Sequence, residues 1–127
     1  MPHHSRLYKA VIDVSADEHD RELAFWQAAV GQTLAPFEGQ PEYHGTKLEG
    51  QEFALLTQRL DGGTSRVHLD IHTDDLDAEV TRLERLGARR VRQVRGWWIM
   101  EDPAGLPFCV ILTRPGSLHD RNSRRWD

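Results

Sequence analysis

The chain has 127 residues, enough for one domain with a hydrophobic core, and its formal net charge of -4 without a basic stripe argues against nucleic acid as the main partner. No apolar run approaches the roughly 20 residues that a membrane helix needs, and no signal-peptide region follows the amino terminus. The single cysteine, Cys109, excludes an internal disulfide and fits the reducing cytoplasm, where we expect the protein to reside.

The first half of the chain predicts one strand, one helix and three more strands. Alternating apolar residues indicate strands, and apolar residues at helical spacing indicate a helix that ends at Gly31. His19 and His44 are expected to be exposed, as is the terminal pair His3-His4. The expected elements are strand 7–14, helix 18–30, short strand 33–37, loop 39–43, and strands 44–48 and 52–59.

The second half predicts the same order of elements. In its first strand Val67, Leu69 and Ile71 alternate with His68, Asp70 and His72, so three ionisable side chains share one face. Asp74-Asp75 is a helix N-cap signal, and Gly87 stands where a glycine commonly ends a helix. Strands are expected at 89–95, 97–101 and 108–113, followed by a polar, loosely held tail at 115–127.

Matching residues indicate that the two halves are an internal repeat. AVIDVSAD, a helix and Gly31 correspond to VHLDIHTD, a helix and Gly87, which places Asp13 opposite Asp70 in the repeat. The last strands also match, with Gly50 to Ala54 corresponding to Gly105 to Cys109. One such unit leaves a sheet face uncovered and requires a second. We therefore expect a single domain at 6–114, with units at 6–60 and 64–114.

Three stretches carry a resemblance to a known superfamily. They are the helix with Phe25-Trp26, HLDIHTDDLDAEVTRLERLGA and EDPAGLPF. They resemble the vicinal oxygen chelate superfamily, which includes glyoxalase I, extradiol dioxygenases and bleomycin-resistance proteins. The chain is most similar to its bacterial glyoxalase-like domains. The resemblance implies an α+β fold in which two tandem βαβββ units form a cupped mixed sheet.

The resemblance also assigns metal-ligand positions. In metal-bearing members the ligands come from the first and last strands of each unit, which correspond here to Val11, Ala54, His68 and Cys109. Valine and alanine cannot coordinate a metal, so we expect no metal and no cofactor. The alternative is a zinc site made by His68, Asp70 and Cys109.

The implied cup defines the candidate site residues. Asp13, His68 and Asp70 are the candidate catalytic residues, with one carboxylate as general base and His68 as acid or electrophile. The alternative is that each carboxylate is hydrogen-bonded or paired with Lys9 or Arg66. Residues expected to contact the ligand are Lys9, Cys109 and Trp98, the last in preference to Trp97. Cys109 is otherwise a small buried residue or a nucleophile paired with His68.

Two functions follow from this set of residues. The first is metal-independent binding of a small, flat or aromatic molecule, as in the resistance proteins. The second is a lyase, isomerase or hydrolase that uses His68 with Asp13 or Asp70. The sequence does not decide whether the protein is an enzyme, and it leaves a homodimer open because sheet edges remain available.

Overall fold

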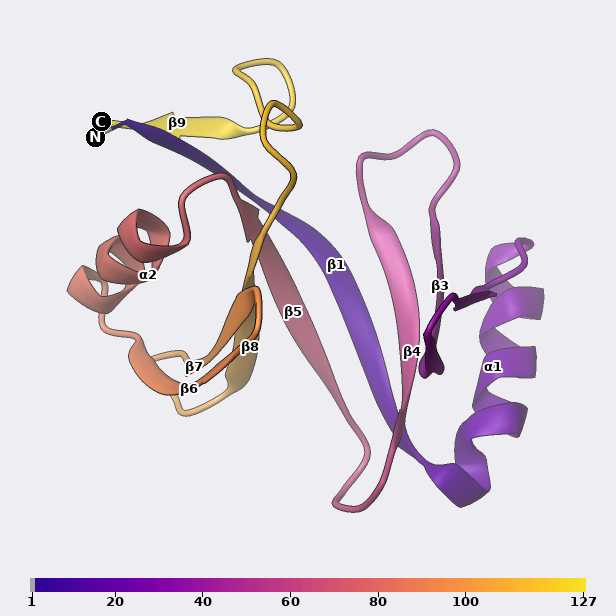
Figure 1. The fold of residues 1–127 in the computed structure, drawn as a ribbon. Helices are drawn as coiled ribbons and strands as arrows, with labels where there is room; N and C mark the ends of the chain where they lie inside the picture. The colour runs from indigo at the N-terminus through magenta and orange to yellow at the C-terminus, as the bar shows by residue number, and fades with distance from the viewer. Residues whose placement is uncertain (1) are drawn as a thin grey trace. The chain divides into compact units, whose positions relative to one another are not determined.

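The computed structural model describes residues 2–127, in which two helices and nine strands form (Figure 1). The order is a strand, a helix and three strands, repeated once and followed by a ninth strand. The α+β class predicted from the sequence is confirmed. The elements are β1 (His3–Ser15), α1 (Ala16–Val30), β2 (Ala35–Phe37), β3 (Gln40–Lys47), β4 (Ala54–Leu60), β5 (Arg66–Thr73), α2 (Leu76–Arg85), β6 (Arg89–Val94), β7 (Trp97–Glu101), β8 (Pro107–Leu112) and β9 (Arg124–Trp126).

The chain divides into two compact units. The first-repeat unit is Lys9–His68, and the second-repeat unit combines Leu69–Asp127 with residues 2–8. The long strand β1 therefore contributes its first residues to one unit and the remainder to the other. This division differs from the boundaries expected from the sequence, because the repeat pattern cannot show how β1 is shared.

Each unit has the same strand order. In the first-repeat unit the order is β2-β3-β4-β1, and in the second-repeat unit it is β6-β7-β8-β5. The last strand of each repeat pairs in parallel with its first strand, with Ile12 opposite Thr57 and Asp70 opposite Cys109. The other pairings within these two sets of strands are antiparallel. Both units therefore have mixed sheets of the same topology, as an internal repeat requires.

Local signals set the limits of the helices. Asp75 caps α2 by accepting a hydrogen bond from the backbone N–H of Ala78 at 3.1 Å. Gly31 follows α1 with a φ of 72°, a left-handed conformation that glycine adopts without steric cost. Gly87 follows α2 with a φ of 110°. The cap and both glycine stops agree with the sequence prediction.

Each unit contains its own buried apolar residues. In the second-repeat unit α2 and the sheet enclose Val80, Leu83, Met100 and Val110, and Ile71 packs against them. Leu69, on the same face of β5 as Ile71, is 43% exposed. The core beneath α2 thus extends to Ile71 but not to Leu69. In the first-repeat unit the buried apolar residues are Val11, Ile12, Val14, Leu34, Ala54 and Leu56.

The two ends of the chain differ most from prediction. β9 pairs antiparallel with the start of β1, and His3 lies opposite Trp126 (Figure 1). Within the expected loose tail Leu118 is only 6% exposed, and the Trp126 indole N–H donates to Ser5 Oγ at 2.9 Å. The tail is therefore an ordered part of the second-repeat unit. The loop expected at 39–43 is also wrong, because β3 begins at Gln40.

Neither helix in residues 2–127 has the length and apolar character needed to cross a membrane.

Candidate functional site

The first-repeat unit pairs a buried carboxylate with a histidine. Asp13 lies in β1, and its side chain is 0% exposed. His68 is the third residue of β5, is 13% exposed, and places its Nδ1 2.6 Å from Asp13 Oδ2. A contact of this length between an imidazole and a carboxylate is a strong, charge-assisted hydrogen bond. Two residues predicted as catalytic candidates, 55 positions apart in the chain, are therefore in direct contact.

Arg66 provides a second partner, and a permanent positive charge, at the same carboxylate. It lies two residues before His68 on β5, and side chains at this spacing project from the same face of a strand. Its Nε is 3.4 Å from Asp13 Oδ2, and its side chain is half exposed. Within residues 2–127, the other oxygen, Asp13 Oδ1, is buried without a hydrogen-bond partner. Because an unpaired buried charge is costly, His68 and Arg66 together stabilise ionised Asp13.

The contact with Asp13 determines how the His68 ring can act. An ionised carboxylate only accepts hydrogen bonds, so His68 Nδ1 carries the hydrogen and Nε2 is the accepting nitrogen of the neutral ring. The carboxylate also stabilises the imidazolium that forms when Nε2 takes up a proton. The pair can therefore hold a polar group of a ligand or transfer a proton.

The exposed part of Arg66 borders an open pocket of about 400 Å³. Its lining combines apolar side chains from β1 and β5 with two carboxylates from α1. The lining residues are Ile12, Asp13, Val14, Glu18, Glu22, Ser65, Arg66 and Val67. Arg66 thus connects a solvent-accessible pocket with the buried carboxylate of Asp13.

Asp70 and Cys109 belong to the second-repeat unit. Asp70 is 4% exposed and lies opposite Cys109 in the parallel pairing of β5 and β8. Cys109 is a partly buried free cysteine between Phe108 and Val110. Asp70 is buried like Asp13, its counterpart in the repeat, so both repeats carry an inward carboxylate at this position.

The structure places Lys9 in the first-repeat unit and Trp98 in the second-repeat unit. Lys9 belongs to the first-repeat unit, where it is partly buried on β1 and alternates onto the same face as Asp13. Trp98 packs against the core of the second-repeat unit, on the same face of β7 as Met100. This packing gives no support to the expectation that Trp98 contacts the ligand in preference to Trp97. Strand alternation places Trp97 on the opposite face of β7.

The donor set does not fit the metal site of the metal-bearing superfamily members. Of the four equivalent positions, Val11 and Ala54 are buried apolar residues, at 1% and 6% exposure. Only His68 and Cys109 offer donor atoms, whereas a zinc site needs three or four. No chemical step is therefore assigned to a metal at these positions.

Two histidines expected at the surface are buried in hydrogen-bonded positions. His19 on α1 is 1% exposed and its Nε2 lies 3.0 Å from Thr57 Oγ1. Burial is the main reason that the pKa of His19 falls below its ordinary value. His3 is 6% exposed and contacts the buried Glu79. The spacing of His19, Leu23 and Trp26 on one helix face was a sequence signal for the burial of His19.

Comparisons with known proteins identify the family and the fold. A family model described as a glyoxalase-like domain matches residues 9–111. No curated protein matches the chain. The chain is similar in structure to methylmalonyl-CoA epimerase from Mycobacterium tuberculosis, with a TM-score of 0.60 and 18% identity over 86% of this chain and 88% of that chain.

Two further solved structures show the same fold at low identity. One is Streptomyces coelicolor methylmalonyl-CoA epimerase in complex with 2-nitronate-propionyl-CoA, with a TM-score of 0.52 and 16% identity over 87% of this chain and 95% of that chain. The other is 2,2',3-trihydroxybiphenyl 1,2-dioxygenase from Sphingomonas wittichii strain RW1. It has a TM-score of 0.57 and 14% identity, covering 94% of this chain and 44% of that chain.

Proposed function

Because the chain belongs to the glyoxalase-like domain family of the vicinal oxygen chelate superfamily, we propose that it binds a small organic molecule beside His68. The ligand carries either an O–H or N–H group that donates to Nε2 of the neutral imidazole or an acceptor oxygen to which the imidazolium donates. The observation that carries this proposal is the contact of His68 with fully buried Asp13. An imidazole oriented in this way presents a defined polar group, which is what specific binding of a small molecule requires.

The chemical preference of the site differs from the one expected from the sequence. An aromatic ligand was expected from Trp98, which instead packs in the core of the second-repeat unit. Arg66, half exposed and in contact with Asp13, supplies N–H donors for an acceptor oxygen of the ligand. The proposed ligands are therefore oxygen-rich, such as 2-oxo acids, carboxylates and acyl thioesters. The thioesters are included because one structurally similar epimerase is described in complex with a CoA derivative.

A thermal-shift screen of these three ligand classes tests the binding proposal. A ligand at about 100 times its Kd stabilises the folded protein by about 2.7 kcal/mol, which raises the melting temperature measurably. The same ligand should give a much smaller shift with His68→Ala, which we expect to fold because Arg66 still pairs with the buried Asp13. Shifts that are equal in wild type and His68→Ala, or no shift with any class, would refute the proposal.

The same contact favours a second candidate function, proton transfer in a lyase or isomerase reaction. His68 Nε2 would remove a proton from carbon next to a carbonyl group, and Asp13 would stabilise the imidazolium that results. This reaction requires no metal ion bound at the positions equivalent to the superfamily's metal ligands. It requires that the bound ligand present an acidic C–H to His68.

Deuterium exchange distinguishes the enzyme from the binder. Ligands from the screen are incubated with the protein in deuterated water, and loss of the proton next to the carbonyl is followed by NMR. Asp13→Asn should slow exchange by roughly a thousandfold, because it removes the charge that stabilises the imidazolium and allows the wrong tautomer. Asp61→Asn, an exposed loop residue, is the matched control. Binding without exchange would support the binding function and refute the proton-transfer function.

A further inference from the structure

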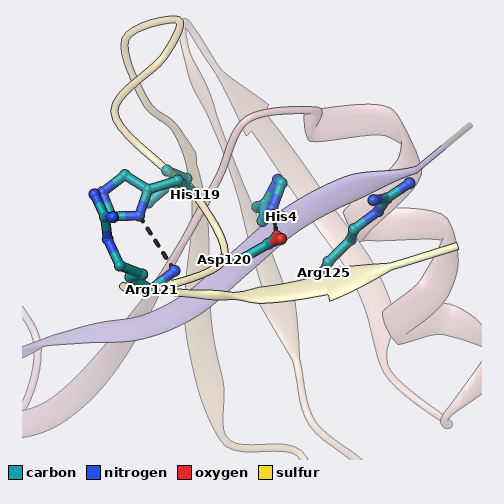
Figure 2. A pocket seen from close by; sticks show the side chains of 6 residues that line it. His4, His119, Asp120, Arg121 and Arg125 are labelled. Atoms are coloured by element: carbon teal, nitrogen blue, oxygen red, sulfur yellow. Dashed lines mark hydrogen bonds and ion pairs between the residues drawn. The ribbon is translucent and has the colours of Figure 1, made fainter.

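The C-terminal loop of the second-repeat unit borders a second open pocket, which none of the residues around His68 line. Its volume is about 460 Å³, and four of its six lining side chains are basic (Figure 2). Figure 2 shows His4 from β1 beside Asp120, with His119 and Arg121 on one side and Arg125 on the other. The sixth residue is Leu118, which is buried. The pocket is thus lined mainly by basic side chains, together with the buried apolar side chain of Leu118.

Hydrogen bonds within the loop hold its side chains in position. The backbone N–H of His119 donates to Asn122 Oδ1 at 2.9 Å, and Asn122 Nδ2 donates to the carbonyl of Ser117 at 2.9 Å. Ser123 Oγ donates to the carbonyl of His119 at 2.7 Å. A loop ordered by its own contacts loses little conformational entropy when a ligand binds.

A further hydrogen bond in the loop fixes which ring nitrogen of His119 can donate. The backbone N–H of Arg121 donates to His119 Nδ1 at 3.2 Å, as the dashed line in Figure 2 marks. Because Nδ1 accepts, the hydrogen of the neutral His119 ring is on Nε2. His119 Nε2 and the Arg121 guanidinium are therefore both hydrogen-bond donors. Within residues 2–127, the Arg121 guanidinium has no ion pair or hydrogen bond.

The acidic residue in the pocket is neutralised by a histidine. Asp120 Oδ1 lies 2.8 Å from His4 Nε2, while His4 Nδ1 lies 3.2 Å from Asp74 Oδ2. Both ring nitrogens can donate to these carboxylates only when His4 is the imidazolium. Arg125 pairs with exposed Asp127 at 3.2 Å, an exposed contact of the kind that contributes little and can yield to a ligand.

We propose that this pocket binds a phosphate group, either as the free ion or on a small molecule, through Arg121, Arg125 and His119. Planar guanidinium groups hydrogen-bond phosphate oxygens in pairs, and the imidazole N–H supplies a further donor. His4 keeps Asp120 from repelling the anion. The site is independent of the proposed function, since it uses none of the residues around His68.

An NMR titration of the full chain tests the site. Inorganic phosphate and phenyl phosphate are added at constant ionic strength at about pH 6, and the backbone amides of residues 117–125 are followed. Saturable shifts confined to this loop are expected, with tighter binding of phenyl phosphate if the ligand is a phosphate ester and of inorganic phosphate if it is the free ion. Shifts spread over the chain, or equal to those with chloride, would mean an adventitious ion only and overturn the proposal.

Variants identify the donors. Arg121→Gln with Arg125→Gln should weaken phosphate binding by at least about tenfold, as expected for lost charge-assisted hydrogen bonds. Arg114→Gln, an exposed arginine that does not line the pocket, should leave the affinity within about twofold. Arg121→Gln alone removes no contact within the described chain, so it remains a test if the double variant does not fold. Unchanged affinity in both Arg121 variants would refute the site.

The pH dependence of anion binding tests the role of His4. Contact with Asp120, opposed by burial and aided by Asp74, raises the pKa of His4 above its ordinary value. Sulfate keeps its charge throughout such a pH titration. It should therefore bind less tightly as the pH rises through the pKa of His4, because deprotonated His4 no longer offsets the negative charge of Asp120. The charged groups facing this contact are Asp74, Asp120, His119 and Arg125. His4→Gln should reduce this pH dependence because it removes the group that titrates, and an unchanged dependence would contradict the role of His4.

Discussion

Replacing Glu79 with alanine should destabilise the second-repeat unit more than any change at an exposed carboxylate of α2. Glu79 is on the buried face of α2 and is 0% exposed. Its Oε1 contacts His3 Nε2 at 2.8 Å, and Arg82 donates to both carboxylate oxygens at 2.8 and 2.9 Å. Burial alone would raise the pKa of Glu79, but hydrogen bonds from Arg82, His3 and Ser5 outweigh burial and lower it.

These contacts give the size of the effect. Removing one partner of a buried ion pair costs about 3–5 kcal/mol, because the remaining groups lose their acceptor. Arg82 is 23% exposed and can turn toward water, so we expect a loss near the lower end, about 3 kcal/mol. Because the folded-state pKa is lowered, the contribution of Glu79 is complete above its ordinary pKa of 4.5 and is lost as the pH falls through the folded-state value.

Urea denaturation at neutral pH, followed by circular dichroism, measures this loss. Glu84→Ala is the matched control, since Glu84 lies on the exposed side of the same helix and its carboxylate pairs with the partly exposed Arg90 at 3.0 Å. The control should change the free energy of unfolding by less than about 0.5 kcal/mol. If Glu79→Ala loses no more than Glu84→Ala, the buried contacts do not stabilise the fold as argued here. The difference between wild type and Glu79→Ala should also shrink in acid.

Three further changes test other parts of the fold. Burial lowers the pKa of His19, so its contribution to stability is complete above 6.5 and is lost as the pH falls below that value. His19→Gln should therefore reduce the drop in urea midpoint between about pH 7.5 and about pH 5, and an unaltered drop would be inconsistent with this origin. Gly45→Ala places a Cβ 2.7 Å from Leu56 Cγ and should cost about 1–3 kcal/mol, whereas Gly62→Ala meets nothing within 4 Å. Equal melting temperatures for these two variants would contradict the packing argument. Trp126→Ala removes an indole hydrogen bond to β1 and a ring that stacks on a guanidinium, so it should lower the melting temperature by an amount equivalent to about 1–3 kcal/mol. An unchanged melting temperature would mean that β9 does not stabilise the start of β1.

The elements of the candidate site were predicted from the sequence to different extents. His68 stood out because polar residues alternate with aliphatic ones along its strand, Asp13 stood out because it matches Asp70 in the repeat, and the two are in contact in the structure. Trp98 was chosen over Trp97 as a ligand contact, but alternation separates these two side chains without showing which face a helix covers, and Trp98 packs against the core beneath α2. His119, Arg121 and Arg125 could not be found, because a polar segment without periodicity gives no sign that it folds back on β1.

The sequence alone determined the order of the elements from β1 to β8. Apolar periodicity, the Asp75 cap and the glycines after each helix are local features, so they can be recognised without knowing which segments pair. The repeat was visible for the same reason, since two copies of one pattern require two copies of one local structure.

Only the tertiary structure decided which polar groups are buried and which residues meet. His3 contacts Glu79, 76 positions away, and the start of β1 pairs with β9 at the other end of the chain. Such contacts form between segments whose own sequences carry no record of their partners. They are selected by the burial of apolar surface and by the free-energy cost of leaving buried polar groups without partners, which are properties of the packed chain as a whole.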